Sequence, residues 1–293
     1  MVRDVLSSPK VENMKRKRAV RRKRLAILLF VLFVTLTGAL AYFSGHEKVV
    51  INSISVEGNH IINTSDVEDT AWKDLSGKYL YLFSRSNTLI YPKEKIYKDL
   101  RTEFPRIETL SVYRSGIHTL KIVMTERAGE YLYCGASIPL DPTEVGDNCY
   151  FINSDGYIFD KAPYFSGNVY FKYYMPLSSS DGTPSSDPLG MQMLPPGEFH
   201  ALVTFIDSTS SLGLRPVTLS LGDNSMYLLT LWHAQGATAP YIIFKKGDDL
   251  STLFGNLSAA MKSSEFANDI HSKYATLLYI DLRFQDKVLY KFQ

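Results

Sequence analysis

The side chains that most often carry out catalysis are scattered along this sequence. The histidines show no HxH or HExxH spacing that would suit a metal ion; they are His46, His60, His118, His200, His233 and His271. The chain has no GxSxG nucleophile elbow and no Walker loop. Asp248 and Asp249 are adjacent acids at the predicted start of a helix, where carboxylates suit the helix dipole. We therefore predict that the protein is not an enzyme and uses no metal, cofactor or small-molecule substrate.

The two cysteines, Cys134 and Cys149, allow a structural disulfide. Such a bond would close a loop of about 15 residues and stabilise the fold by roughly 3 kcal/mol. It requires an oxidising compartment. The alternative is a pair of unpaired thiols, because many exported bacterial proteins lack disulfides. Neither cysteine belongs to a CxxC motif, so a zinc or redox role is not expected.

Charge and hydropathy change abruptly at one place in the chain. Residues 1–24 contain ten Lys/Arg and two acids, whereas residues 45–293 contain 22 Lys/Arg and 28 acids. Between them, residues 25–43 carry no charge, and a helix of that length spans roughly 28 Å, about one hydrocarbon core. Basic residues stay on the cytoplasmic side of a membrane. We predict a cytoplasmic tail (1–24), a transmembrane helix (25–43) and an extracytoplasmic remainder, in the plasma (inner) membrane.

Two other interpretations of this segment were weighed. Ala39-Leu-Ala41 is typical of a signal-peptide cleavage site, but the apolar run exceeds the ~7–15 residues of a signal core. The basic run at 15–24 suits nucleic acid, but next to an apolar segment it is better explained as a topology signal with affinity for anionic lipid. We therefore expect membrane lipid and no nucleic acid as a partner. No later apolar run approaches ~18 residues, so a channel or transporter is not expected.

The pattern of residues 45–128 predicts a strand, two helices and two strands. Val67, Ala71 and Leu75 recur at helical spacing after the caps Ser65 and Asp66. Two helices on one face of a small sheet give an α+β layer architecture. The predicted elements are a strand at 49–56, helices beginning near 65 and 92, and strands at 107–113 and 119–126.

Residues 129–293 predict a second, β-rich α+β domain. Residues 176–197 contain five prolines and many Ser and Gly, so we expect a surface loop there. Helices are predicted at 198–212 and 248–262. Strands are predicted at 131–134, 149–152, 157–159, 215–221, 226–233, 240–245, 275–282 and 287–292.

A series of short motifs follows the basic tail and the apolar segment in a fixed order. The motifs are Ile54-Ser-Val56-Glu-Gly58, Phe104-Pro105-Arg-Ile107, Val112-Tyr-Arg114, Thr119-Leu-Lys-Ile122 with Glu126-Arg127, Ile152-Asn-Ser-Asp155-Gly156 and Ile280-Asp281-Leu282-Arg283-Phe284. With this order, the chain over about residues 15–293 resembles the FtsQ/DivIB family of bacterial division proteins. The resemblance implies a POTRA-like domain at 45–128 and an FtsQ-like β domain at 129–293. The chain departs from the family pattern at Ile117, Gly129 and Asn153.

The last predicted strand is the natural candidate for a binding edge, because it ends the chain. It alternates three residues, Lys287, Leu289 and Lys291, with the apolar set Val288, Tyr290 and Phe292. An exposed edge offers unpaired backbone groups to which a partner strand can add. The alternative is that the apolar set faces the domain's own core, which still leaves the backbone edge available.

The resemblance also implies partners and further site residues. It implies that the C-terminal sheet receives FtsB/DivIC-like and FtsL-like bitopic division proteins, with Phe284 and Phe292 as contact aromatics. It implies a second docking surface on the POTRA-like domain, for which Arg101, Arg106 and Arg114 are candidates. The alternative for these arginines is simple solvated charge. Asp281 is expected to be structural, and Arg283 is either a partner contact or a structural ion-pair partner.

The sequence thus predicts a non-catalytic, single-pass scaffold of the divisome, located at the division septum. Its extracytoplasmic sheet would hold other divisome components by strand addition. Two further hypotheses remain open at this point. One is a membrane-anchored POTRA chaperone or secretion-associated factor that binds unfolded exported chains, and the other is an anchored hydrolase.

Overall fold

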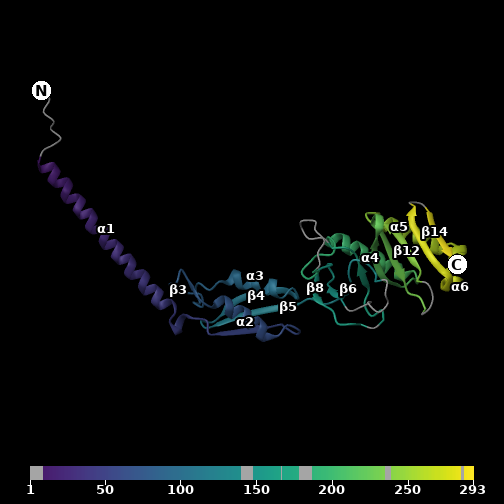
Figure 1. The fold of residues 1–293 in the computed structure, drawn as a ribbon, viewed down its shortest axis with the longest axis horizontal. Coiled ribbons are helices and arrows are strands. Elements are labelled where there is room, and N and C mark those ends of the chain that lie inside the picture. Colours follow the sequence, from purple (N-terminus) through teal and green to yellow (C-terminus); the bar gives the residue numbers. More distant parts are fainter. Residues whose placement is uncertain (1–8, 140–147, 166, 178–186, 235–238, 285–286) are drawn as a thin grey trace, which may run out of the picture. The chain divides into compact units, whose positions relative to one another are not determined.

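The computed structural model describes residues 9–139, 148–165, 167–177, 187–234, 239–284 and 287–293 (Figure 1). The chain divides into two units, residues 1–126 and residues 127–293. Each unit has a hydrophobic core of its own. The predicted mixed α+β class, with an N-terminal apolar helix and a large β-rich domain, is confirmed.

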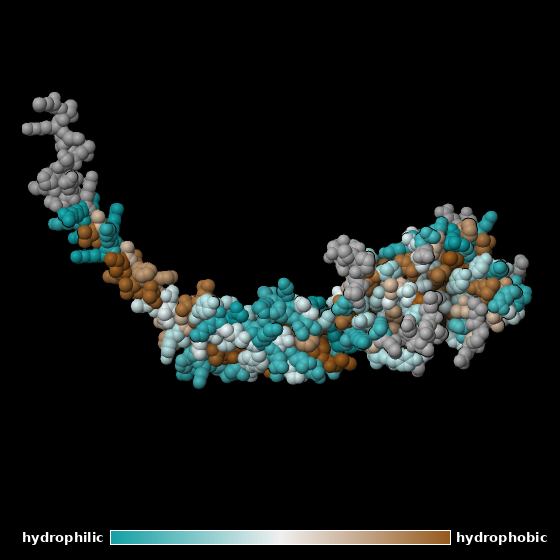
Figure 2. Space-filling view, in the orientation of Figure 1, coloured by the Kyte–Doolittle hydropathy of each residue, from teal (hydrophilic) through white to brown (hydrophobic). Residues whose placement is uncertain are grey.

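The first element is a long helix, α1 (Pro9–Ser44), so most of the basic tail is helical rather than preceding the helix. Its segment from Arg16 to Ser44 is long and apolar enough to cross a membrane, and the most apolar window is not buried against protein. Figure 2 shows this hydrophobic surface along α1. The Thr35 and Thr37 hydroxyls donate to carbonyls three or four residues earlier, so they are satisfied within the helix, as a lipid environment requires.

The remainder of the first unit is a three-stranded sheet with two helices. The sheet has the order β1-β5-β4, with β1 parallel and β4 antiparallel to β5. After α1, the elements of this unit in chain order are the 3-10 turn η2 (Glu47–Val49), β1 (Ser53–Glu57), α2 (Thr64–Leu75), the separate hairpin of β2 (Lys78–Tyr79) and β3 (Phe83–Ser84), α3 (Lys93–Glu103), β4 (Ile107–Ser115) and β5 (Thr119–Glu126).

The core of this unit follows from two periodicities. Alternate residues of β5 are almost fully buried, and so are residues at helical spacing on α2 and α3. The buried set includes Leu120, Ile122, Met124, Val67, Ala71, Leu75, Ile96 and Leu100. Gly58, after β1, has a φ of +85°, and a Cβ there would collide with the Met124 carbonyl, so the turn requires glycine.

The predicted boundaries of this unit differ from the observed ones at two places. The predicted strand at 49–56 begins only at Ser53, because the backbone of residues 47–49 closes into a 3-10 turn. The N-cap of α2 is Asn63, not Ser65 or Asp66. The hairpin β2–β3 was not predicted.

The second unit is a nine-stranded mixed sheet covered on one face by three helices, α4 (Pro196–Ser211), α5 (Leu250–Lys262) and α6 (Ser264–Lys273). The strand order is β14-β13-β12-β11-β10-β9-β6-β7-β8. The strands are β6 (Tyr131–Tyr133), β7 (Tyr150–Ile152), β8 (Ile158–Lys161), β9 (Lys172–Tyr174), β10 (Pro216–Gly222), β11 (Met226–Leu231), β12 (Tyr241–Lys245), β13 (Leu277–Phe284) and β14 (Lys287–Phe292). Two short 3-10 turns, η4 (Asp223–Ser225) and η5 (Tyr274–Thr276), complete the unit.

The main core of this unit lies between the sheet and the helices, and aromatic rings fill much of it. Phe199 and Phe205 of α4 pack beside Tyr173 and Phe244 of the sheet, with ring centroids 5.5 Å and 5.1 Å apart. A smaller cluster of Leu132, Cys149 and Ala162 is separate from this core.

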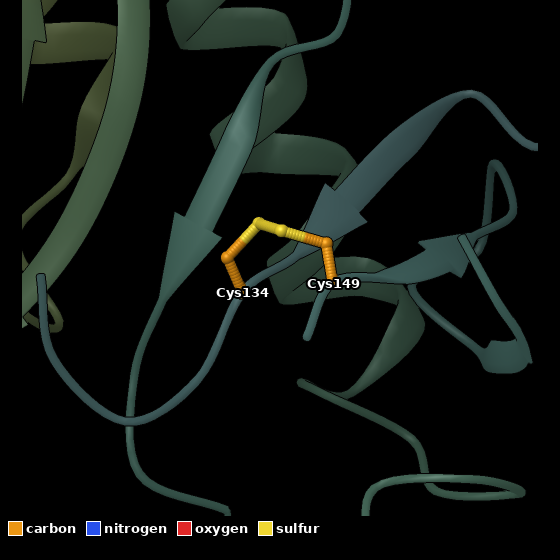
Figure 3. The surroundings of a disulfide bond; sticks show 2 residues. All are labelled: Cys134 and Cys149. Atoms are coloured by element: carbon orange, nitrogen blue, oxygen red, sulfur yellow. A yellow bond between two sulfur atoms is a disulfide. The ribbon is translucent and has the colours of Figure 1, made fainter. Parts of the chain in front are cut away.

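A disulfide joins Cys134 and Cys149, with an S–S distance of 2.03 Å (Figure 3). It links the residue after β6 to the residue before β7, two neighbouring antiparallel strands. Closure of this loop restricts the unfolded chain, an effect of about 3 kcal/mol for a loop of this length.

The prediction of a surface loop at 176–197 is wrong at its ends. Leu177, Met193 and Leu194 are buried in the main core, because they flank α4 and β9, which pack there. Residues 178–186 of that prediction lie outside the described residues. The strand β9 and the helix α6 were not predicted.

Candidate partner-binding edge

The strand β14 lies at one end of the nine-stranded sheet. It pairs antiparallel with β13, with Tyr290 opposite Ile280 and Leu289 opposite Asp281. Within the part of the chain that the structure describes, no strand pairs with its other side. Roughly half of the N–H and C=O groups of such a strand point away from its neighbour. This edge therefore presents backbone groups to which another strand can bind.

At the opposite end of the same sheet, the start of strand β8 is bonded by another segment of the chain. The Ile158 N–H donates to the Met191 carbonyl, and the Gly190 N–H donates to the Ile158 carbonyl, both at 2.9 Å. The Met193 N–H donates to the Gly156 carbonyl, also at 2.9 Å. The segment around 190–193 thus occupies the backbone groups of Ile158 at the start of β8 and the carbonyl of Gly156 just before it.

The side chains of β14 alternate between two environments. Val288, Tyr290 and Phe292 are half-buried and pack against the main core, so they face their own domain. The Tyr290 ring lies 4.3 Å, centroid to centroid, from the Phe266 ring of α6. Lys287, Leu289 and Lys291 are exposed on the other face, and Leu289 keeps 46% of its accessible surface.

A groove runs beside the helix-facing side of β14. Its volume is about 350 Å³. Small side chains at the end of α5 leave this space open, and an aromatic ring and two β14 residues form the rest of the wall. The lining residues are Asn256, Ala259, Ala260, Ser263, Phe266, Val288 and Tyr290. Side chains of an added strand that point toward the helices would enter this groove.

Phe284 and the neighbouring ion pair end β13 at the same edge. Phe284 is 49% exposed, and the Arg283 guanidinium lies 6.0 Å from its ring centroid. Arg283 Nε donates to Asp281 Oδ1 at 2.8 Å and Nη2 donates to Oδ2 at 2.5 Å. Burial raises the pKa of the Asp281 carboxyl, but the hydrogen bonds and charge of Arg283 outweigh this and leave the pKa below its usual value. Arg283 is therefore an ion-pair partner in this structure, and Asp281 is structural.

The three arginines named for the second docking surface do not form one patch. Arg101 Nη1 donates to the Tyr97 hydroxyl at 3.0 Å on α3, and Arg114 Nη1 donates to the Thr88 carbonyl at 3.3 Å. Arg106 precedes β4 and Arg114 is near its end, so they are roughly 27 Å apart at the usual rise per residue. The positive charge of Arg106 instead contributes to the lowered pKa of Glu126.

Glu126 itself has a structural role at the end of β5. Its carboxylate accepts hydrogen bonds from the backbone N–H groups of residues 60–62, at 2.7–3.0 Å. Burial alone would raise the pKa of this carboxyl. The three backbone donors and the charge of Arg106 outweigh burial, so the pKa of Glu126 lies below its usual value. Glu126 therefore fixes the loop between β1 and α2.

The histidines and paired acids form structural contacts. His118 Nδ1 lies 2.9 Å from the Val50 carbonyl, and His200 Nε2 lies 3.2 Å from Asp155 Oδ1. Asp249 caps α5 by accepting from the Ser251 N–H. Among the described residues, no group of three or more His, Cys, Asp or Glu side chains is placed to hold a metal ion.

A second hollow of about 640 Å³ lies between α4 and the start of α5. Its rim carries Lys246 and Glu198, 3.8 Å apart, and the Tyr227 hydroxyl donates to Glu198 at 3.4 Å. Burial raises the pKa of Tyr227, so this hydroxyl stays protonated. The size is within the range of ligand pockets, and the charged groups at its rim already pair with one another.

No family model matches the chain, and no curated protein matches its sequence. The functional assignment therefore depends on the edge, the groove and the residue patterns.

The groove residues were missed from the sequence. Ala259, Ala260 and Ser263 follow Leu253 and Leu257 on α5, so the helix changes from large to small residues toward its end. That change is the signal that a hollow exists beside the last turn. Its position next to β14 depends on tertiary packing and has no signal in the local sequence.

Proposed function

We propose that this protein is a non-catalytic, single-pass membrane scaffold of the bacterial divisome. It recruits or holds an FtsB/DivIC-like partner, together with FtsL-like proteins, by addition of a partner strand to β14. The observation that carries the proposal is the contrast within one sheet. The β8 edge is bonded at its first residue, Ile158, by the chain's own residues 190–191, whereas β14, among the described residues, borders a groove and has no strand beyond it.

The chemistry of the edge defines the partner strand. A six-residue strand such as β14 offers about three N–H and three C=O groups outward, and each bond contributes roughly 0.5–1.5 kcal/mol net. Alternate side chains of the partner would enter the groove over Ala259 and Ala260, so they are apolar and of moderate size. The other face of the partner meets Lys287 and Lys291, which favours acidic residues there.

The membrane helix contributes to this function by confinement. With its N-terminus in the cytoplasm, α1 tethers the rest of the chain to the membrane on its outer side. A bitopic partner is confined to the same surface, which raises its effective concentration at the edge. Modest affinity of the strand contact is then sufficient.

The first unit supplies the second, POTRA-like docking surface of the proposal. Because Arg101 and Arg114 are separated on the unit, they would belong to different contacts. Arg101 is exposed on α3 and stacks on Tyr97, with the guanidinium 5.8 Å from the ring centroid. Arg114 lies at the end of β4 nearest to α1, beside Thr88.

Two matched positions test the edge proposal. Leu289 on β14 is 46% exposed, and Leu189 beside the segment that covers β8 is 40% exposed. We expect a photo-crosslinking residue at position 289 of the full-length protein to capture a partner with an extracytoplasmic strand in growing cells. The same residue at position 189 captures it weakly or not at all. Leu289→Asp abolishes co-purification of the partner, and Leu189→Asp leaves it unchanged. Equal capture at both positions would contradict strand addition at β14.

Imaging a tagged full-length copy in dividing cells separates the division role from the chaperone alternative. A divisome scaffold gives rings at mid-cell. A chaperone or secretion factor gives a uniform peripheral signal, and its crosslinks at position 289 are to many exported chains rather than to one bitopic protein.

A further inference from the structure

The turn of the hairpin β2–β3 exposes apolar side chains almost completely. Leu80 is 83% exposed and Tyr81 is 94% exposed, and Leu82 keeps half of its surface. We call residues 80–82 the hairpin tip. Isolated apolar residues are common on protein surfaces, but three in succession at a protruding turn indicate contact with something apolar.

The backbone of the hairpin tip has a left-handed conformation that large side chains such as Leu and Tyr rarely adopt. Leu80 has a φ of 48° and Tyr81 a φ of 61°, and the Leu82 N–H donates to the Tyr79 carbonyl at 2.9 Å. Residues 79–82 thus form a β-turn with positive φ at both central positions, a conformation for which Asn-Gly is the favoured pair. A bulky side chain in this conformation is strained. The sequence therefore maintains large apolar groups at a cost to the local fold, which indicates a function for them.

Hydrogen bonds fix the hairpin to the end of α1. The Ser84 N–H donates to Ser44 Oγ at 3.0 Å, and Asn87 Nδ2 donates to the Ser44 carbonyl at 2.9 Å. Ser44 and Asn87 are both buried. Only eight residues separate Ser44 from the first strand, and part of them forms η2. The hairpin is therefore held at the last residue of α1 by direct contacts rather than through a flexible linker.

The direction of the hairpin follows from the order of these contacts. The Thr88 N–H donates to the Val49 carbonyl at 2.9 Å, beyond the end of α1. Four residues earlier, Ser84 already contacts Ser44 at the helix end. Continuing back along the hairpin brings the tip toward the apolar part of α1, within roughly 10 Å of Ser44 at the rise of a strand. Figure 1 draws β3 beside this end of α1, and Figure 2 shows hydrophobic surface there.

Neighbouring residues suit a membrane interface. Tyr42 and Phe43 on the last turn of α1 are exposed, and aromatic residues are enriched at the headgroup level of membranes. At the base of the hairpin, Lys78 is exposed and the Arg85 guanidinium lies 5.5 Å from the Tyr79 ring centroid. Apolar groups at the tip and cations at the base match acyl chains and lipid phosphates, in that order of depth.

We propose that the hairpin tip inserts into the outer leaflet of the membrane that α1 spans. The occupant of this exposed surface is lipid, specifically the upper part of the acyl chains. The proposal depends on α1 being a membrane span and is independent of the strand-addition function. Insertion gives the first unit a second point of attachment beside α1, which limits its tilt and rotation relative to the bilayer.

Fluorescence quenching in the full-length protein tests this proposal. A cysteine placed at Leu82 is labelled with bimane, since the oxidised Cys134–Cys149 pair does not react, and the protein is reconstituted in phosphatidylcholine brominated near the top of the acyl chains. We expect this reporter to lose roughly half or more of its emission, as a group a few ångströms deep would. The control is Ile61→Cys, also an exposed residue, on the loop at the far end of β1. It should stay unquenched.

One further sample, with the reporter at another position, makes each outcome decisive. A reporter at Leu32, in the middle of α1, must be quenched by lipids brominated deep in the chains if α1 spans the bilayer. If Leu32 is quenched but Leu82 is no more quenched than Ile61, the insertion proposal is overturned and the membrane anchor stands. If the Leu32 reporter is also unquenched, the insertion proposal and the membrane anchor both fail, whatever the result of the crosslinking at β14.

The double substitution Leu80→Asn with Tyr81→Gly separates lipid contact from folding. It supplies the residues that the turn favours, so the hairpin remains folded and the thermal midpoint does not fall. We expect quenching at Leu82 to drop toward the Ile61 value. Unchanged quenching in this folded variant would overturn the role of Leu80 and Tyr81 as the inserted groups.

Discussion

The two edge strands of the nine-stranded sheet differ in whether other residues of the chain bond their outward N–H and C=O groups. At β8 the segment around Gly190–Met193 supplies backbone partners to Gly156 and Ile158. At β14, among the described residues, the sheet stops at a strand whose outward groups meet no further strand. Sheet edges invite unwanted pairing, and proteins usually cover or disrupt them. The proposed strand addition at β14 depends on this contrast between the two edges.

The two ends also differ in how their side chains are fixed. Near β8, the Gly156 turn packs directly on the Phe199 ring and the disulfide joins the residues that flank β6 and β7. Near β14, the groove wall is made of small residues, and the outer face carries two lysines. Under the proposed function, the β8 end contributes stability and the β14 end contributes the contact surface.

The largest effect is expected from disturbing the covered end. Gly156 has a φ of +84°, and a Cβ there would lie 2.8 Å from Phe199 Cγ, so Gly156→Ala should reduce the free energy of unfolding by about 4 kcal/mol. Gly190→Ala is the matched control, with φ +77° but only the Tyr157 hydroxyl nearby, at 3.7 Å. It should cost about 1–2 kcal/mol. Chemical denaturation of both variants measures the difference, and equal losses would show that the Phe199 contact does not hold this edge.

A smaller effect is expected from the ion pair that supports the open end. Asp281→Asn removes a buried carboxylate from Arg283 and should cost about 2 kcal/mol. Because the folded pKa of Asp281 is depressed, its contribution is complete above the unfolded pKa of about 3.9. That contribution is lost as the pH falls through the folded pKa.

Unfolding curves at neutral pH and below about pH 3 measure how the contribution of Asp281 to stability depends on pH. The gap between wild type and Asp281→Asn should narrow in acid. Asp155→Asn is the control, since its exposed carboxylate contacts His200 at the surface and should change stability by less than about 0.5 kcal/mol. A gap that stays constant with pH would mean that the charge of Asp281 is not what stabilises β13.

The smallest effect on stability is expected at the groove itself. Tyr290→Ala removes the half-buried tyrosine ring that packs against Phe266 and widens the groove. It should reduce the free energy of unfolding by about 1 kcal/mol. Partner capture at position 289 should fall more strongly than stability does. The exposed Tyr164 serves as control, and its replacement by Ala should leave both unchanged. A loss of stability without any loss of capture would assign Tyr290 to the core alone.

Local patterns predicted those elements whose burial has a clear period. The strand predicted at 119–126 has these same bounds in β5, because the buried Leu120, Ile122 and Met124 alternate with less buried residues. Patterns failed where elements are short or continuous. The strand β9 has three residues and shows no alternation. The helix predicted at 248–262 corresponds to α5 alone, and α6, which follows directly after the shared cap residue Ser263, was not predicted.

The candidate site was less accessible to prediction than the fold. Alternation along 287–292 showed which side chains share a face, and the structure packs Val288, Tyr290 and Phe292 on the core as the alternative interpretation held. Contacts between distant parts of the chain decide which strands lie beside β13. Such contacts also place residues 190–193 against the start of β8. The arginines were chosen from the family resemblance, which does not give their spacing, and β4 separates Arg106 from Arg114 along its length.

The bond between Cys134 and Cys149 has a consequence for living cells. Cytosolic glutathione and thioredoxin keep thiols reduced, whereas beyond the plasma membrane such a pair remains oxidised. A copy inserted with its large unit in the cytosol would react with maleimide at both sulfurs, and a copy inserted with its large unit outside would react at neither. This one cystine thus acts as a built-in indicator of orientation, readable by a simple mass shift of the denatured protein.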